Sequence, residues 1–174
     1  MKMKMKKLKL IKLTVNEKLA LVRAFQVSLV RFGKPGLELE QKIIDQLEPH
    51  FPSQKFELNW LLCETLSFLE AQSTAQKAIT LLLKAPTQEE QMEYARSLRT
   101  LKQGWNKKLR TDYFNWFHKA ANYRGGASFS KFIEFIKNDA LASLDEQEKK
   151  DLAPILNKKT VVQSPAEMMA KAMS

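Results

Sequence analysis

The sequence predicts an all-α protein, and three observations support this prediction. Glycine is scarce, at five of 174 residues, and β-branched residues are few beside leucine, lysine, alanine, glutamate and glutamine. That mixture favours helices. Apolar residues recur at helical spacing through most of the chain, and capping residues, glycines or prolines separate these stretches. A chain of 174 residues is long enough for one domain with its own core.

The first predicted helix begins at Thr14, which stands three residues before Glu17 in the spacing of a capping box. It ends at Gly33, which can adopt the positive φ of a helix cap, and Pro35 prevents continuation. Further valines outside its apolar stripe suggest neighbours on more than one side. The stripe consists of Leu21, Phe25, Leu29 and Phe32.

Four more helices follow at short intervals, over about 37–47, 55–70, 73–85 and 87–102. We expect Ser73 to cap the third of these and Thr87 to form a capping box with Glu90. Cys63 falls within 55–70 and is interpreted as a small core or boundary residue. The expected inward residues are Leu39, Ile43, Ile44 and Leu47; Leu58, Leu61, Leu62, Leu66 and Leu69; Ala75, Ala78, Ile79 and Leu82; and Tyr94, Ala95, Leu98 and Leu101.

The aromatic residues gather between Trp105 and Ile136, a stretch with two of the three tryptophans and five of the ten phenylalanines. Gly104 ends the preceding helix, and Asn106 caps a helix with one aromatic face. We predict that this face is core. Stacking of nucleic-acid bases between aromatics and cations is the alternative. The core residues would be Leu109, Tyr113, Trp116, Phe117 and Ala120; the cations would be Arg99, Lys102, Lys107, Lys108, Arg110, Lys119 and Arg124.

The turn Arg124-Gly125-Gly126, followed by Ser128 at a helix start, is the candidate binding site. Helix N-termini attract anions, and Arg124 would add a guanidinium suited to carboxylate or phosphate. The structural interpretation, which we favour, is that the glycines supply positive φ while Ser128 caps the next helix. Its core residues would be Phe129, Phe132, Ile133, Ile136, Ala140 and Leu144.

Two capping boxes close the chain, at Asp145–Glu148 and at Ser164–Glu167. The main helices number about eight and are short. They group into four pairs that begin near residues 14, 54, 87 and 128, a spacing in the size class of HEAT and armadillo helical pairs. We therefore predict a HEAT-like α-solenoid, with an irregular helical bundle as the alternative. The predicted regions are a basic tail (1–13), a helical-repeat domain (14–157) and a C-terminal tail with a short helix (158–174).

The net charge of +10 comes largely from the start of the chain, where six lysines alternate with apolar residues up to Lys12. This segment is interpreted as a solvated tail, a docked edge segment or an anchor for anionic surfaces. No apolar run reaches the roughly 20 residues of a membrane span. Nor does the uninterrupted apolar region of a signal peptide follow the lysines.

No enzyme motif is present, and neither His50 nor His118 has a ligand at metal-binding spacing. Both histidines are interpreted as structural or solvated. One cysteine excludes an internal disulfide and any multi-cysteine metal site. The sequence therefore predicts a protein that is not an enzyme and that has no cofactor.

One resemblance covers roughly residues 20–157. It is carried by FPSQKFELNWLLCETLSFLEA, TQEEQMEYARSLRTLKQGW and YFNWFHKAANYRGGASFSKFIEFIKNDALASL. These segments resemble the helical-repeat region of large extracytoplasmic, planctomycete-type proteins of the HEAT-repeat or heme-binding-domain class. In such proteins a β-propeller often precedes this region and a c-type cytochrome domain often follows it. This chain has neither a CxxCH motif nor a propeller. The resemblance therefore implies a fold and a spacer or docking role. The residues of the matching turn are Arg124, Gly125, Gly126, Ser128 and Phe129.

The predicted function is a non-catalytic helical scaffold or protein-docking module, which the resemblance would make a fragment of a larger redox protein. Its partner would be another protein or a neighbouring domain. The alternative is a nucleic-acid-binding helical domain that uses the basic tail and the cations of residues 99–124. The resemblance implies an extracytoplasmic location. The missing signal-peptide pattern points to the cytoplasm if the chain is complete as given.

Overall fold

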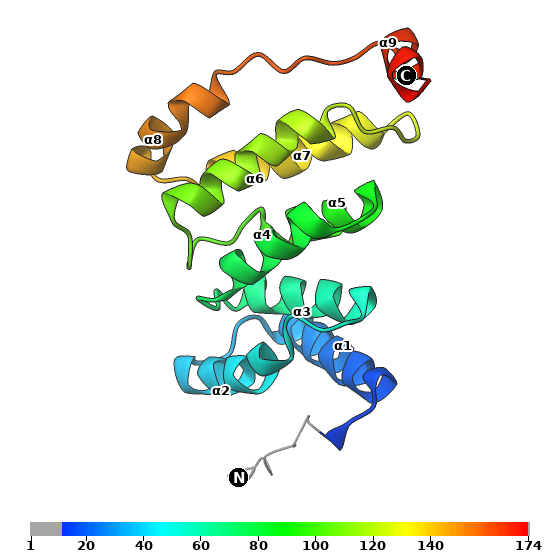
Figure 1. Ribbon diagram of the computed structural model, residues 1–174. Coiled ribbons are helices and arrows are strands. Elements are labelled where there is room, and N and C mark those ends of the chain that lie inside the picture. The colour runs from blue at the N-terminus through cyan, green and yellow to red at the C-terminus, as the bar shows by residue number, and fades with distance from the viewer. Residues whose placement is uncertain (1–11, 174) are drawn as a thin grey trace, which may run out of the picture.

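The computed structural model describes residues 12–173, which form helices and no strand, as the all-α prediction required (Figure 1). The predicted basic tail thus lies almost wholly outside the described residues. The elements are α1 (Val15–Phe32), α2 (Leu37–Leu47), a 3-10 turn η2 (Glu48–His50), α3 (Phe56–Phe68), α4 (Thr74–Lys84), α5 (Gln88–Leu98), α6 (Lys107–Ala120), α7 (Phe129–Ala142), α8 (Glu146–Leu156) and α9 (Pro165–Ala172).

Most of the predicted helix starts are confirmed by their caps. Reciprocal capping boxes close the N-termini of α1, α8 and α9. The Asn106 side chain accepts a bond from the Leu109 N–H at the start of α6. Ser73 does not cap α4; its hydroxyl instead donates to the Glu48 carboxylate of η2. Its αR backbone explains this, because side-chain capping needs an extended N-cap residue.

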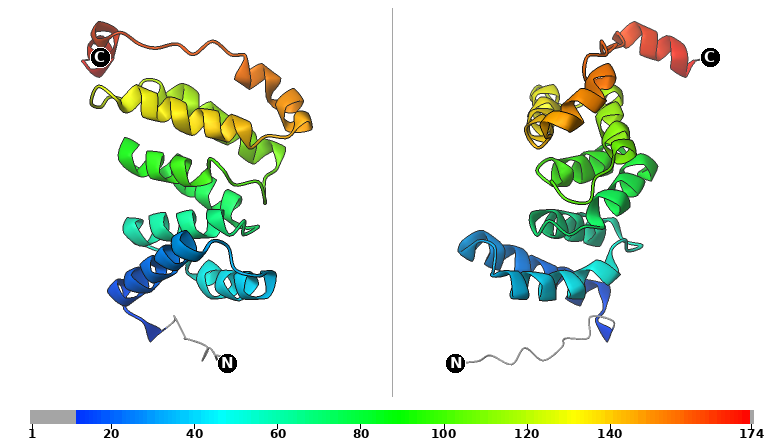
Figure 2. Two further views of the ribbon diagram at one scale, coloured as in Figure 1. Left: turned by 180° about the vertical axis from the view of Figure 1, so that it is seen from behind. Right: turned by 90° about the vertical axis from the view of Figure 1, so that its left-hand side faces the viewer.

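The helices form two rows (Figure 2). In one row α1 packs against α3, α3 against α5, and α5 against α7; in the other, α4 packs against α6 and α6 against α8. Contacts of α3 with α4 and of α4 with α5 join the rows. The core between them takes nearly all the predicted inward residues, including the aromatic face of α6. That face is core, as predicted.

Three polar links cross the α1–α3–α5–α7 row at similar sequence separations. Gln26 donates to Glu64 at 3.0 Å across 38 residues, and Arg96 pairs with the same carboxylate at 3.0 Å across 32 residues. Arg99 then reaches Asp139 at 3.0 Å across 40 residues. Each link therefore joins one helix of the row to the next, with Arg99 acting as the C-cap residue of α5.

The loops at one edge of the stack also pack against each other. The Glu70 carboxylate accepts bonds from the backbone N–H groups of Lys102 and Gln103, at 2.9 and 3.0 Å. Gly104 follows with φ of 75°, and a Cβ there would lie 1.9 Å from the Gln72 carbonyl oxygen. Both the dihedral angle and the close approach require glycine at this position.

The predicted apolar stripes were wrong at a few positions near the ends of the stack. Phe32, in the last turn of α1, is 84% exposed, whereas Val22 is fully buried. Leu39 and Phe132 are each 41% exposed. In the described residues α1 makes extensive contact only with α3, so only one of its faces is covered. The neighbours expected on its other sides are not found among those residues.

Candidate functional site

The turn between α6 and α7 is the predicted binding site, and the structure exposes it. Residues 124–128 are all exposed at one end of the α6–α7 pair. The expected positive φ is wrong, since neither Gly125 nor Gly126 has one. A Cβ on Gly125 would nevertheless lie 2.4 Å from Cγ of the Phe129 ring, while a Cβ on Gly126 would meet nothing within 4 Å. Glycine is therefore needed at Gly125, because Phe129 folds back against it.

Ser128 does not cap α7, which corrects the second part of the prediction. Its side chain makes no capping bond, and its backbone has φ −96° and ψ 0° instead of the extended conformation of an N-cap residue. The Phe129 N–H bonds to the Gly126 carbonyl at 2.9 Å, and the Ser128 carbonyl accepts from Phe132. The turn is therefore closed by backbone bonds.

Gln88, the first residue of α5, fastens this turn to the helix before it. Its amide nitrogen donates to the Arg124 carbonyl at 2.5 Å, and its amide oxygen accepts from the Arg124 N–H at 3.3 Å. The side chain thus pairs with the backbone as a neighbouring strand would. Thr87, which accepts a bond from the Glu90 N–H, fixes the start of α5 and so the position of Gln88.

Gln91, one turn further along α5, is buried and bonds to side chains at the end of α6 and in the segment just before the turn. Its amide oxygen accepts from Trp116 Nε1 at 3.0 Å, from Lys119 Nζ at 3.3 Å and from the Tyr123 hydroxyl. Its amide nitrogen donates to the Ala85 carbonyl at 2.7 Å. Neither glutamine was predicted from the sequence. The only available signal was their i, i+3 spacing at the start of a helix.

Two of the cations proposed for nucleic-acid binding, Arg110 and Arg99, are held in ion pairs. Arg110 is buried, stacks on the Trp105 ring at 4.1 Å and bonds to Glu148 at 2.8 Å. Burial lowers the pKa of Arg110, and the bonds to Glu148 oppose that shift. Arg99 pairs with Asp139. Because the α6 aromatics are core as well, bases could not stack on them.

Two side chains of the α6 end hold the extended segment that leads to α9. His118 contacts the Thr160 hydroxyl through Nδ1 at 2.8 Å and the Ile155 carbonyl through Nε2 at 3.0 Å. Asn122 donates to the Val161 carbonyl at 3.1 Å and accepts from the Gln163 N–H at 2.8 Å. The segment therefore runs along α6 before the chain reaches α9 (Figure 1).

The other histidine, His50, lines a hollow of about 330 Å³ together with Lys18, Ser53 and Lys55. Burial, and then the charge of Lys18, lowers the pKa of His50. No three His, Cys, Asp or Glu side chains in residues 12–173 lie close enough to hold a metal ion. Cys63 is fully buried, and burial raises the pKa of its thiol to about 12. It is therefore a poor nucleophile in the folded chain.

Comparison with known proteins found no match to the chain among protein families, curated proteins or solved structures. Within the described residues, no helix combines the length and the apolar character needed to cross a membrane.

Proposed function

We propose that this chain is a non-catalytic, HEAT-like solenoid module whose α6–α7 turn, residues 124–128, docks an acidic partner protein or a neighbouring domain. The solenoid part of the proposal is supported by the two rows of helices. It is also supported by polar links that recur after 38, 32 and 40 residues. These separations are close to the spacing of the predicted helical pairs, which supports a repeating arrangement.

The observation that carries the docking role is an exposed turn fastened from beneath. Gln88 pairs with the backbone of Arg124, and Gln91 bonds to Tyr123 and Trp116. Most exposed turns lose conformational freedom when a partner binds, at a cost in affinity. A turn already held in one conformation avoids much of that cost.

The charge of the segment that forms the turn favours an acidic partner, and Glu89, which accepts a bond from Gln88, is an acid beside it. Residues 113–133 contain the cations Lys119, Arg124 and Lys131 and not one Asp or Glu. Cations at the rim of an interface steer an oppositely charged surface toward it and fix its orientation. The family resemblance suggests which class of partner this could be, because the similar helical regions often lie between a propeller and a cytochrome domain. We propose that this chain occupies a comparable position as a spacer or docking element.

The test uses a photo-crosslinking amino acid placed at Ala127 in the turn, with Gln147 on the exposed side of α8 as the matched control position. We expect a defined acidic protein or domain to crosslink at 127 and not at 147. The complex is then rebuilt from the two purified proteins. Arg124→Glu should weaken it at least about tenfold, and Gln88→Ala should weaken it while the secondary structure stays unchanged.

Two results would contradict the docking role. One is equal crosslinking at positions 127 and 147. The other is a purified complex whose dissociation constant is unchanged by Arg124→Glu.

A further inference from the structure

The positive charge of the chain is concentrated at one end. Residues 1–37 contain ten lysines and arginines and a single acidic residue, Glu17, whereas residues 38–174 contain nineteen cations and eighteen acids. Nearly all of the net charge of +10 therefore belongs to α1 and the segment before it. Among the described residues, 12–37 hold five of these cations and only one acid, Glu17. Because α1 is the first helix of its row, this described part of the charge, here called the basic pole, lies at one end of the stack (Figure 1).

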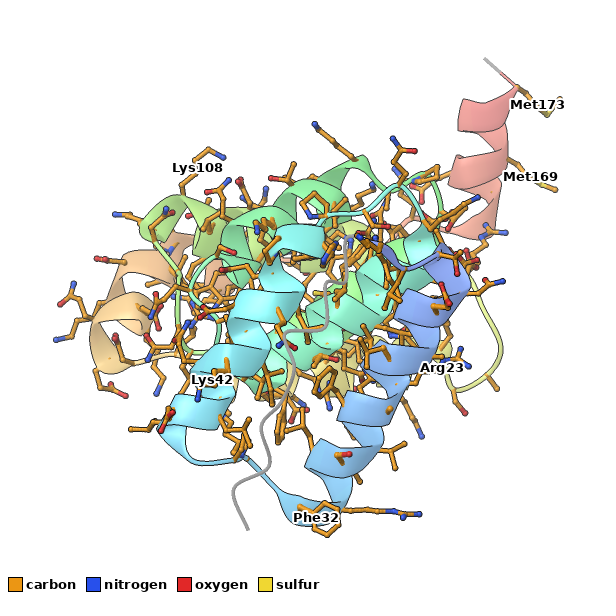
Figure 3. The ribbon with its side chains drawn as sticks, turned by 90° about the horizontal axis from the view of Figure 1, so that it is seen from below. Arg23, Phe32, Lys42, Lys108, Met169 and Met173 are labelled. Atoms are coloured by element: carbon orange, nitrogen blue, oxygen red, sulfur yellow. The ribbon has the colours of Figure 1, made fainter. Side chains whose placement is uncertain are left out.

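The face of α1 turned away from α3 is both basic and apolar. Ala20, Arg23, Ala24, Val27 and Arg31 are all exposed on it. Figure 3 looks onto α1 and α2 from this end of the molecule. No acidic side chain occurs along α1 after Glu17 in its first turn. The face thus combines cations with small and medium apolar groups.

The connection from α1 to α2 adds large apolar side chains. Val30 is 86% exposed, Phe32 84% and Leu37 85%. Phe32 points away from the ribbon in Figure 3. Arg31 and Lys34 stand between these three residues in the sequence. Val30 and Phe32 are two residues apart in α1, so they project to different sides of its last turn. So much exposed apolar surface around one helix–helix connection is unusual, and it marks an interaction site.

We propose that residues 30–37, together with the exposed face of α1, bind peripherally to an anionic lipid surface. Apolar side chains of this size enter the boundary between headgroups and acyl chains, while Arg and Lys remain at the level of the lipid phosphates. Each cation near such a surface adds to the attraction. A nucleic acid would pair with the cations but leave Val30, Phe32 and Leu37 in water, so the lipid surface fits the observations better.

The neighbouring helix fixes the orientation of the bound molecule. α2 carries Glu38, Glu40 and Asp45 and only one cation, Lys42. An anionic surface repels these carboxylates, so the α1 side faces the lipid and α2 tilts away. This site lies at the opposite end of the stack from the α6–α7 turn (Figure 1). The lipid proposal therefore goes beyond the docking function and can fail or hold independently of it.

The experiment measures co-sedimentation of the full chain with phosphatidylcholine vesicles that contain or lack phosphatidylserine. We expect binding only with phosphatidylserine, and weaker binding as salt rises. The double variant Phe32→Ser, Leu37→Ser should lower the partition coefficient at least about tenfold, and so should Arg31→Glu, Lys34→Glu. Phe135→Ser is the matched control, because Phe135 is a 66% exposed aromatic residue of α7, far along the row from α1. It should bind as the original chain does.

Several outcomes would overturn the proposal. Failure to bind phosphatidylserine vesicles is the simplest of them. Another is unchanged binding in both double variants, Phe32→Ser, Leu37→Ser and Arg31→Glu, Lys34→Glu, together with loss of binding when the five lysines of residues 1–11 are replaced by glutamine. That result would assign the activity to the segment before α1. A third is tighter binding to duplex DNA than to vesicles, unaffected by the Phe32→Ser, Leu37→Ser variant, which would make the basic pole a nucleic-acid site.

Discussion

At the residue scale, Gly104 is the position where the backbone tolerates least change. It combines φ of 75° with a backbone carbonyl in the space that a Cβ would fill. We expect Gly104→Ala to lower the free energy of unfolding by about 2 kcal/mol or more. Gly126→Ala, where no atom lies within 4 Å and φ is not positive, should leave stability unchanged or slightly raised. Urea unfolding of both variants checks this, and equal midpoints would contradict it.

Three buried acids make stability fall at alkaline pH. Burial raises the pKa of Cys63 from an ordinary 9.0 to about 12, and it also raises the pKa of Tyr94 and Tyr113. The unfolded chain therefore loses these protons at a lower pH than the folded chain does. The stabilisation is complete below about pH 9 and is lost as pH rises toward about 12.

We accordingly predict that the free energy of unfolding, measured in urea, declines over this pH range. The decline should be shallower in Cys63→Ala, which removes one of the three groups. A variant with the same slope as the original chain would show that the thiol ionises equally in both states.

The candidate turn shows what sequence could reveal about single residues. The exposed position of Arg124, Gly125, Gly126 and Ser128 agrees with the interpretation of a turn. Their detailed roles could not be predicted from the sequence. Ser128 has a backbone conformation that cannot cap, and Phe129 folds back on Gly125. Gln88 and Gln91 were missed for a different reason. A glutamine on a helix carries no local signal that its amide will meet a segment 36 or 32 residues away.

At the scale of elements, α8 is joined to α6 by an ion pair whose arginine, Arg110, is buried. Arg110 is nearly inaccessible, and its guanidinium depends on Glu148 and on Ser143 for its hydrogen bonds. Glu148 also closes the capping box of α8 with Asp145. One carboxylate therefore both starts the helix and docks it.

Glu148→Gln separates these two roles, because glutamine also suits the capping box. It removes the charge opposite a buried guanidinium, and we expect a loss of about 3 kcal/mol in the free energy of unfolding. Glu146→Gln, in an exposed pair with Lys149, is the control and should change stability by less than about 0.5 kcal/mol. Similar urea midpoints for the two variants would mean that water reaches Arg110.

Helix positions followed from sequence because their signals are local. The bounds of α2 agree with the prediction, and the capping boxes of α1, α8 and α9 are confirmed. Burial at the ends of the stack could not be predicted in the same way. Phe32 has helical spacing with Phe25 and Leu29, yet its exposure depends on the absence of a helix beside it in the described part of the chain. Apolar periodicity shows which face could be covered, and only the arrangement of helices decides whether it is.

At the scale of the whole molecule, neighbours differ in number from one helix to the next. α3 contacts α1, α2, α4, α5 and η2, whereas α8 makes extensive contact with α6 alone among the described elements. In stacked helices, stability depends on the contacts of each unit with its neighbours. We predict that native-state hydrogen exchange is slowest in α3 and α5 and faster in α1, α2 and α8. Equal protection in all helices would indicate that the chain unfolds only as a whole.

The polar links of the α1–α3–α5–α7 row also determine how the molecule would carry tension. Extensive contacts join each helix of the row to the next one, and α1 makes none with α5 or α7. A pulling force between the two ends thus passes through the successive junctions of this row, and from α3 onward α4 and α6 share the load beside it. Gln26–Glu64, Arg96–Glu64 and Arg99–Asp139 each span one junction. We expect the chain to lengthen by small rotations at these junctions while its helices stay intact, so that two bodies attached to it could move apart without detaching.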